Sequence, residues 1–172
     1  MKKVLLIMVA LFCVTTVSAQ SKVKEAANYV ASQKWSVGLR ATYGVQAVAE
    51  CFYADKAYLE GRIGLFNGLS ADFAVLHNWN CYNWNWTPNV GGWFLDAGVG
   101  GNIGGQRGFC YGGVVGMVKF GIKFNKVPIR LAIDYSPAIN IYGTYGESDS
   151  AHKVGLYSAG FFNGALSATW CF

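Results

Sequence analysis

From residue 35 to the end of the chain, apolar residues alternate with small or polar residues at a period of two. In 36–46, for example, Val37 and Leu39 alternate with Gly38 and Arg40. This period predicts β-strands with one apolar face. The same pattern predicts strands over 58–65, 69–75, 80–86, 92–102, 113–124, 129–136 and 162–172. The sequence therefore predicts an all-β protein with eight strands.

Charged residues inside these segments all fall on the polar face. Five are basic and four are acidic, and the apolar face of the same segments carries no Lys, Arg, Asp or Glu. The interior of an eight-stranded barrel is just wide enough for side chains to fill it, and buried charges need partners there. We therefore predict a luminal ion-pair network of Arg40, Glu60, Arg62, Asp72, Asp96, Lys119, Lys123, Arg130 and Asp134.

Two features decide which face points inward. A soluble, lipocalin-like barrel would expose the polar face, rich in Lys and Glu, but here that face is mostly Gly, Ala, Ser and Thr. Aromatic residues on the apolar face gather at strand ends, as in the girdles of membrane barrels. The predicted girdle comprises Trp35, Tyr43, Trp84, Trp86, Trp93, Phe124, Tyr135, Trp170 and Phe172. The expected fold is an eight-stranded antiparallel up-and-down transmembrane β-barrel.

The strand over 80–86 follows from the turns. In outer-membrane barrels both termini and the short turns lie on the periplasmic side. The short turns at 66–68 and 125–128 share that side only if an additional descending strand lies between 77 and 91. The alternative interpretation makes 78–91 a long loop rich in Asn and Trp.

Composition excludes several classes of protein. Only 13% of residues are charged, against roughly 25% in ordinary soluble domains. Aromatics at 16% exclude a disordered chain. After residue 19 no stretch approaches the ~20 uninterrupted apolar residues of a spanning helix. The net charge of +5 falls to about +1 over 35–172, without a Lys/Arg cluster, so we expect no nucleic-acid partner.

The N-terminus has the pattern of an export signal. Lys2 and Lys3 precede an apolar stretch, and small residues stand before a predicted cleavage site after Ala19. Residues 1–19 are therefore predicted to be a signal peptide, with an N-terminal anchor helix as the alternative. Residues 20–34 form either a leader or a short amphipathic helix, and the barrel covers 35–172.

With these features in view, the chain resembles the small outer-membrane β-barrel proteins of Gram-negative bacteria, the OmpA/OmpX-like group. The final strand ends in Trp170-Cys171-Phe172, similar to the C-terminal signal that the barrel-assembly machinery recognises in that group. Segments 97–105 (AGVGGNIGG) and 129–137 (IRLAIDYSP) are similar to motifs in Bacteroidota barrel proteins. The resemblance implies location in the outer membrane, with lipid and the assembly machinery as partners, and it implies no catalytic residues.

Few residues suggest further chemistry. Cys51, Cys81 and Cys110 are placed near the outer loops by this register, and one disulfide among them is possible in an exported protein, as Cys51–Cys81 or Cys81–Cys110. No Cys/His spacing indicates a metal site, and we expect no cofactor. The two histidines, His77 and His152, are placed in outer loops.

We therefore expect a non-enzymatic barrel with a filled lumen, acting in envelope structure or in surface interaction through its outer loops; the surface ligand is left open. Two alternatives remain at this stage. Interior glycines would leave space in a narrow pore or transporter for small or hydrophobic solutes. A lipid-modifying barrel enzyme would use a loop histidine, either His77 or His152.

Overall fold

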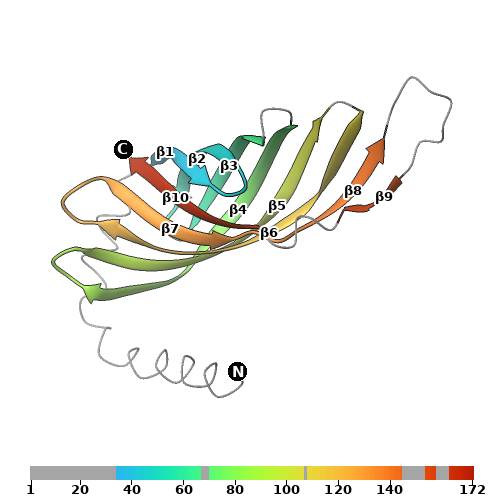
Figure 1. The fold of residues 1–172 in the computed structure, drawn as a ribbon. Coiled ribbons are helices and arrows are strands. Elements are labelled where there is room, and N and C mark those ends of the chain that lie inside the picture. Colours follow the sequence, from blue (N-terminus) through green and yellow to red (C-terminus); the bar gives the residue numbers. More distant parts are fainter. Residues whose placement is uncertain (1–33, 67–69, 107, 145–153, 158–162) are drawn as a thin grey trace, which may run out of the picture.

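A computed structural model describes residues 34–66, 70–106, 108–144, 154–157 and 163–172 (Figure 1). These ranges contain no helix with the length and hydropathy needed to cross a bilayer. Their strands are β1 (Trp35–Ala41), β2 (Val45–Ala54), β3 (Ala57–Phe66), β4 (Ser70–Thr87), β5 (Gly91–Gln106), β6 (Phe109–Phe124), β7 (Ile129–Tyr135), β8 (Ala138–Thr144), β9 (Val154–Tyr157) and β10 (Gly164–Cys171).

The strands form a closed barrel in which every pairing is antiparallel. Each of β1 to β6 pairs with the next strand in the chain, β7 also pairs with β10, and β10 pairs with β1 to close the ring. β7 and β8 lie in line along β6 without a register shift, and the break between them contains Pro137, which has no N–H for the ladder. Counting β7–β8 as one wall strand, the described residues form an eight-stranded up-and-down barrel, as predicted.

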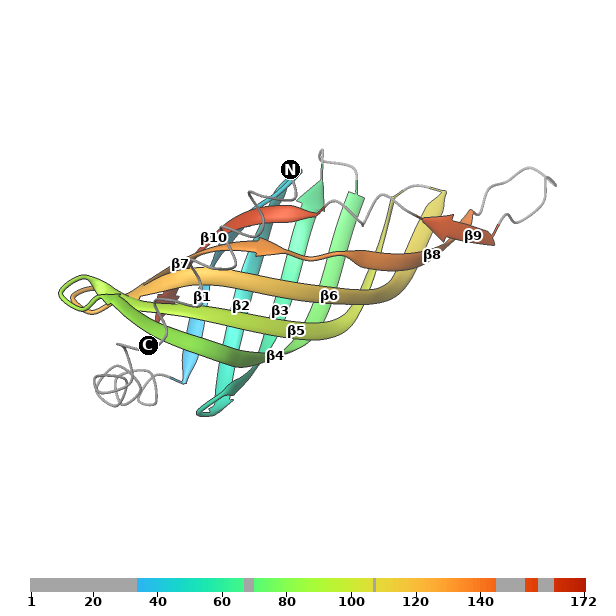
Figure 2. The ribbon, with the colours of Figure 1, turned by 90° about the horizontal axis from the view of Figure 1, so that it is seen from below.

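The two ends of the barrel differ. The terminal rim contains Trp35 and Phe172, whose backbones are hydrogen-bonded to each other, and the turns at 55–56, 88–90 and 125–128. The distal rim contains the turn at 42–44 and Gly108, which follows the end of β5. β4, β5 and β6 have 16 to 18 residues, whereas β1, β2, β3 and β10 have 7 to 10. One wall therefore extends well beyond the other (Figures 1 and 2).

Two strand predictions were wrong, and the errors cancel in the strand count. The predicted strand over 36–46 ends at Ala41, and the chain turns at 42–44 into β2, which the sequence did not predict. Conversely, the predicted strands over 69–75 and 80–86 are one strand, β4, which continues through a bulge between Asn80 and Tyr82. A bulge adds a residue without ending the strand, so alternation resumes after it.

These corrections change which turns share a side. Because β3 ascends and β4 descends, the strand ends that flank the predicted turn at 66–68 lie at the distal rim, not beside the termini as predicted. The turn at 125–128 does lie at the terminal rim, as predicted, and the turn at 88–90 lies on the same side. Between the predicted strands over 129–136 and 162–172, the structure also contains β8 and β9, which extend the long wall.

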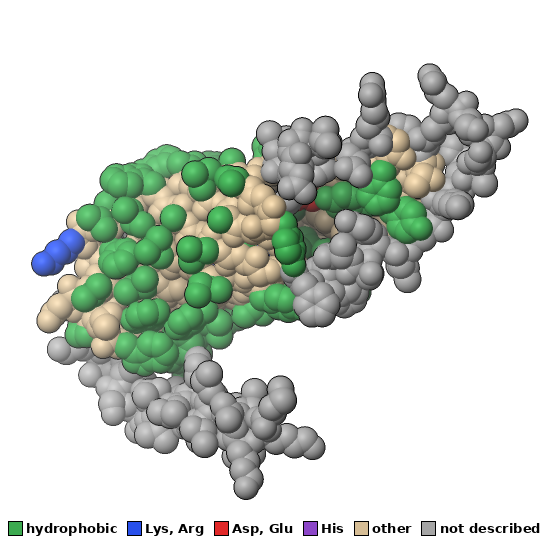
Figure 3. Space-filling model, viewed as in Figure 1, with side chains coloured by type: hydrophobic (Ala, Val, Ile, Leu, Met, Phe, Trp, Pro, Cys, Tyr) green, Lys and Arg blue, Asp and Glu red, His purple; other side chains and the backbone are tan. Residues whose placement is uncertain are grey.

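The exterior of the barrel is apolar. Large hydrophobic side chains on the outward face are mostly 40–65% exposed, for example Leu39 at 60%, Ile63 at 62% and Ile133 at 65%. Figure 3 shows such side chains spread over the visible wall. The inward face of the same strands holds the buried residues, such as Arg40 and Arg62. A water-soluble barrel shows the opposite arrangement.

Eight of the nine predicted girdle aromatics lie on the outside with part of their surface exposed. Trp84 is the exception: it is 4% exposed because Tyr82, Trp86 and Phe120 pack around its ring at centroid distances of 4.9, 5.3 and 6.2 Å. It is therefore the centre of an aromatic cluster near the terminal rim, not a rim contact. The others are Trp35, Trp86, Trp93, Phe124, Trp170 and Phe172 toward the terminal rim, and Tyr43 and Tyr135 toward the distal rim.

Inward-facing glycines make room for large polar neighbours. A Cβ on Gly98 would meet Asn78 Oδ1 at 1.8 Å, and one on Gly104 would meet the Tyr111 hydroxyl at 2.3 Å. A Cβ on Gly64 would meet Gln46 Cγ at 2.6 Å. Small and large residues therefore alternate across the interior, which lets it be filled.

Gly98→Ala should destabilise the barrel by about 1–3 kcal/mol, because the added methyl overpacks the buried Asn78 side chain. Gly101→Ala is the matched control on the outer face of the same strand, where an added Cβ would meet only Gly113 O at 3.5 Å. Urea unfolding of both variants, followed by tryptophan fluorescence, measures the difference. Equal stability of the two would contradict the proposed packing.

The ion-paired interior as candidate functional site

The structure places all nine charged residues of the predicted network inside the barrel. Each is at most 9% exposed. Glu50 on β2 joins them at 1% exposed, so the described interior contains five basic and five acidic side chains. Because an unpaired charge is costly in such surroundings, this balance is what a stable polar core requires.

Glu50 on β2 links its own strand to three others. Its carboxylate accepts hydrogen bonds from Lys119 Nζ at 2.9 Å and from Arg130 Nη1 at 2.8 Å. The Ser36 hydroxyl donates a further hydrogen bond to it. β1, β2, β6 and β7 are therefore joined through one carboxylate.

Glu60 on β3 is the second acceptor for Lys119. Lys119 Nζ donates to Glu60 Oε2 at 2.5 Å, and Arg62 Nε donates to Glu60 Oε1 at the same distance. Asn78 Nδ2 donates to Glu60 at 3.1 Å. Arg62 also reaches across the barrel, where Nη1 donates to the Ser136 hydroxyl at 3.0 Å.

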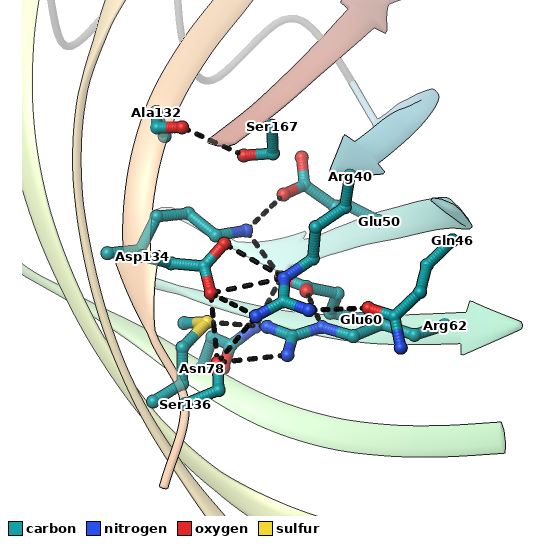
Figure 4. A network of polar contacts seen from close by, with 12 residues as sticks. Arg40, Gln46, Glu50, Glu60, Arg62, Asn78, Ala132, Asp134, Ser136 and Ser167 are labelled. Carbon is teal, nitrogen blue, oxygen red and sulfur yellow. Dashed lines mark hydrogen bonds and ion pairs between the residues drawn. The ribbon is translucent and has the colours of Figure 1, made fainter. Parts of the chain in front are cut away.

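Arg40 and Asp134 form the most direct ion pair. Arg40 Nη2 and Nε donate to the Asp134 carboxylate at 2.6 and 3.0 Å, while Nη1 donates to Gln46 Oε1 at 2.5 Å (Figure 4). Gln46 Nε2 donates to Asp72 at 3.1 Å, and the Tyr111 hydroxyl donates to Asp72 at 2.9 Å. Asp72 is thus held by neutral donors, which connect it to Arg40 through Gln46.

Arg130 lies among aromatic rings. Its guanidinium carbon is 4.2 Å from the centroid of the Phe94 ring and 5.2 Å from that of Phe52, which are cation–π distances. Its Nη2 donates to Asp96 at 3.0 Å, and the Tyr58 hydroxyl donates to the same carboxylate at 2.8 Å. Lys123, the inward neighbour of Arg130 across the β6–β7 ladder, is 7% exposed.

The ion pairs cross the lumen. Around the ring, β2 and β6 are four strands apart and hence opposite each other, and Lys119–Glu50 joins them. β3 and β7 are also opposite, and Arg62 spans from β3 to Ser136 at the end of β7. Next to these pairs, Ala74, Leu76, Val115, Met117 and Ala138 form a buried apolar cluster. The side chains therefore span the barrel from wall to wall.

Some members of the network were missed from the sequence. Glu50, Tyr58, Asn78 and Tyr111 all bond interior charges, but none was predicted. Glu50 lies in β2, where Val48 also points inward at 4% exposed, so polar and apolar residues share that face. A period-two count continued past the turn at 42–44 would have found it.

The cysteines and histidines lie elsewhere than predicted. Cys51, Cys81, Cys110 and Cys171 are free thiols in the structure, so the suggested disulfide is not formed. Cys51 and Cys81 lie in the half of the barrel near the terminal rim and only Cys110 lies near the distal rim, because the strand directions differ from those predicted. His77 is on the outer face of β4 rather than in a loop. His152 lies outside the described residues.

No candidate metal cluster of three or more His, Cys, Asp or Glu side chains occurs among the described residues. The buried acids are occupied instead by Arg, Lys, Tyr, Asn and Gln donors. The arrangement is suited to holding strands together across the barrel.

Fold and interior together define a narrow, closed, eight-stranded antiparallel β-barrel with charges inside and hydrophobic side chains outside. No protein-family model matches the chain, and comparison with curated proteins and with solved structures gives no match. The observed barrel is consistent with the barrel fold of the OmpA/OmpX-like group, and the resemblance is supported at that level alone.

Proposed function

We propose that the chain is an integral outer-membrane β-barrel of a Gram-negative bacterium, exported by its N-terminal signal. The observation that carries this proposal is the inverted polarity: ten charged side chains are buried, while outward-facing Val, Leu, Ile and aromatic side chains are exposed. In water those exposed hydrophobics would form a surface far larger than a soluble monomer tolerates. In a bilayer the same surface is favourable.

The height of the apolar wall fits a bilayer. On β5 the outward residues from Trp93 to Ile103 are all apolar or glycine. Ten steps of ~3.3 Å along a strand tilted by about 40° give a height of about 25 Å, the height of the apolar band of outer-membrane barrels. The C-terminal aromatics Trp170 and Phe172 are 53% and 62% exposed, accessible for recognition by the assembly machinery.

Within the membrane, the proposed role is non-enzymatic. Side chains cross the lumen from opposite strands, as Lys119 does to Glu50, which supports a filled interior. We therefore assign the barrel to envelope structure or to surface interaction through its distal connections.

Location is tested by fractionating cells that produce the protein and washing the membranes at high pH. We expect the protein in the washed outer-membrane fraction, with unboiled samples migrating differently from boiled samples on a gel, because a closed barrel resists detergent until heated. Recovery in the soluble periplasm would overturn the proposal.

The filled interior predicts electrical silence. Purified protein in a planar bilayer should give no resolved conductance steps, because ion pairs such as Lys119–Glu50 span the lumen. A double variant, Glu50→Ala with Lys119→Ala, removes the crossing pair and serves as the positive comparison. Regular conductance steps from the unmodified protein would instead support the alternative of a narrow pore for small solutes.

A further inference from the structure

An apolar groove runs along the outside of β1 to β4. It has a volume of about 520 Å³, within the ~300–1,000 Å³ range of pockets that hold small molecules, and none of its lining residues has a polar side chain. Its floor is made by small residues, Ala47, Ala49 and Gly61. A Cβ built on Gly61 would have no neighbour within 4 Å, so the space above this residue is open.

The strand register explains the shape of the groove. In one row across the wall, Val37, Ala49, Gly61 and Val75 are successive partners, so two small residues lie between two large ones. In the next row, Leu39 and Ile63 flank Ala47. The depression therefore follows the strands for at least two rows and is bounded by larger side chains.

A polar pair lies at the end of the groove nearer the terminal rim. His77 is two residues beyond Val75 on the same face of β4, about 7 Å along the strand. Its Nε2 is hydrogen-bonded to the hydroxyl of Tyr53 on β2, a residue that is 56% exposed. His77 Nδ1 is buried without a hydrogen-bond partner among the described residues, and the ring packs edge-on against Trp79 at 4.4 Å.

The turn between β2 and β3 lies beyond this pair and contains two exposed charged residues, Asp55 and Lys56. The carbonyl of Lys56 accepts a hydrogen bond from Asn80 N at 2.8 Å, which fixes the turn against β4 just beyond His77. Two hydrogen-bonding side chains thus lie at one end of an apolar groove, close to the terminal rim, and the backbone of Lys56 lies just beyond them.

We propose that this groove and the Tyr53–His77 pair bind one glycerophospholipid. An acyl chain occupies the groove over Gly61, and the phosphate lies at the rim. There it accepts a hydrogen bond from the Tyr53 hydroxyl, whose oxygen accepts the Nε2 proton of His77. The match is one of chemistry: hydrocarbon against the apolar groove, and an anion against the donors at its end.

The inference rests on the proposed location in the membrane, since only there does a phospholipid meet this face. It differs from general lipid contact because the polar pair is on one side of the barrel only, beside a groove that would hold a chain. A second copy of the protein is the competing occupant, and its binding would bury the same small residues.

The test is native mass spectrometry of the full-length mature protein in detergent, titrated with a phosphatidylglycerol of defined chains. We expect one lipid to remain bound to the unmodified protein after the others are stripped. Gly61→Leu should fill the groove and lower the singly bound fraction at least fivefold. Gly101→Leu, another outward glycine with room for a side chain, should leave that fraction unchanged.

Two further measurements address the head group. Tyr53→Phe should lower retention about threefold, and diacylglycerol, which has the chains but no phosphate, should be retained less than phosphatidylglycerol. Heat-modifiable gel migration checks that each variant is folded, and Ala49→Val replaces Gly61→Leu if that variant does not assemble.

Equal retention by Gly61→Leu and Gly101→Leu would overturn the site, as would equal retention of diacylglycerol. Dimers that Gly61→Leu abolishes would assign the groove to a second copy instead. These outcomes concern a protein already inserted in the membrane, so they are distinguishable from failure of the fractionation experiment above.

Discussion

Replacing Arg40 by Met should lower the free energy of unfolding by about 3–5 kcal/mol, the usual result of removing one partner of a buried ion pair. Arg40 donates twice to Asp134, and both side chains are at most 1% exposed. Methionine replaces much of the aliphatic stem but leaves Asp134 with the Ser136 hydroxyl as a neutral donor, at 3.0 Å. Urea unfolding in lipid vesicles, followed by tryptophan fluorescence, gives the change.

The double variant Arg40→Met with Asp134→Leu provides the decisive comparison. An apolar pair of similar volume leaves no uncompensated charge, so we expect it to recover more than half of the lost stability. Lys126→Met, an exposed lysine in the turn at 125–128, should change stability by less than about 0.5 kcal/mol. If Arg40→Met is as mild as Lys126→Met, the interior is hydrated and the pair is not buried.

The exterior is tested by Leu131→Arg. Leu131 lies on the outer face of β7, 39% exposed, between its ladder partners Ile122 and Ala168. An arginine facing lipid costs about 2–4 kcal/mol at the midplane and less toward either interface, so the variant should assemble poorly and unfold at lower urea. The folded fraction on unboiled gels and the urea midpoint measure these two effects.

Ser167→Ala is the inward control for that substitution. Ser167 is 4% exposed, and its hydroxyl donates to Ala132 O at 3.4 Å, a long hydrogen bond whose loss should cost less than about 1 kcal/mol. The inward substitution removes one weak hydrogen bond, whereas the outward one places a charge where hydrocarbon is expected. Equal tolerance of Leu131→Arg and Ser167→Ala would mean that the apolar face does not meet hydrocarbon.

The sequence predicted the faces of the barrel better than the ends of its strands. Side chains alternate at a period of two whether or not a strand continues, so every charge in the predicted network was placed on the correct face. The turn at 42–44 was missed because Ala41, Tyr43 and Val45 keep the same alternation through it. β4 was predicted as two strands because its bulge at Cys81 lies in a segment rich in Asn and Trp, residues that also occur in loops.

The sequence predicted the charged members of the interior network but not its neutral members. Charged residues mark the interior by themselves, but neutral donors such as Tyr58 and Asn78 do not, because hydroxyl and amide groups also occur on exteriors and in loops. For Trp84, the sequence predicted the face but not the burial of the side chain. Its position on the apolar face was predicted, whereas its burial depends on Phe120, which comes from another strand and approaches only in the folded barrel.

The Arg40–Asp134 pair also has a consequence for folding. The two residues are 94 positions apart in the chain, and Lys119 is 69 positions from Glu50. Neither pair forms until late segments reach early ones, and such non-local contacts are slow to form. In the proposed setting a half-finished sheet would present lone ammonium, guanidinium and carboxylate groups to hydrocarbon. Entry into the bilayer and the meeting of β1 with β10 are therefore coupled, and an assembly factor that shields the nascent edge would speed both.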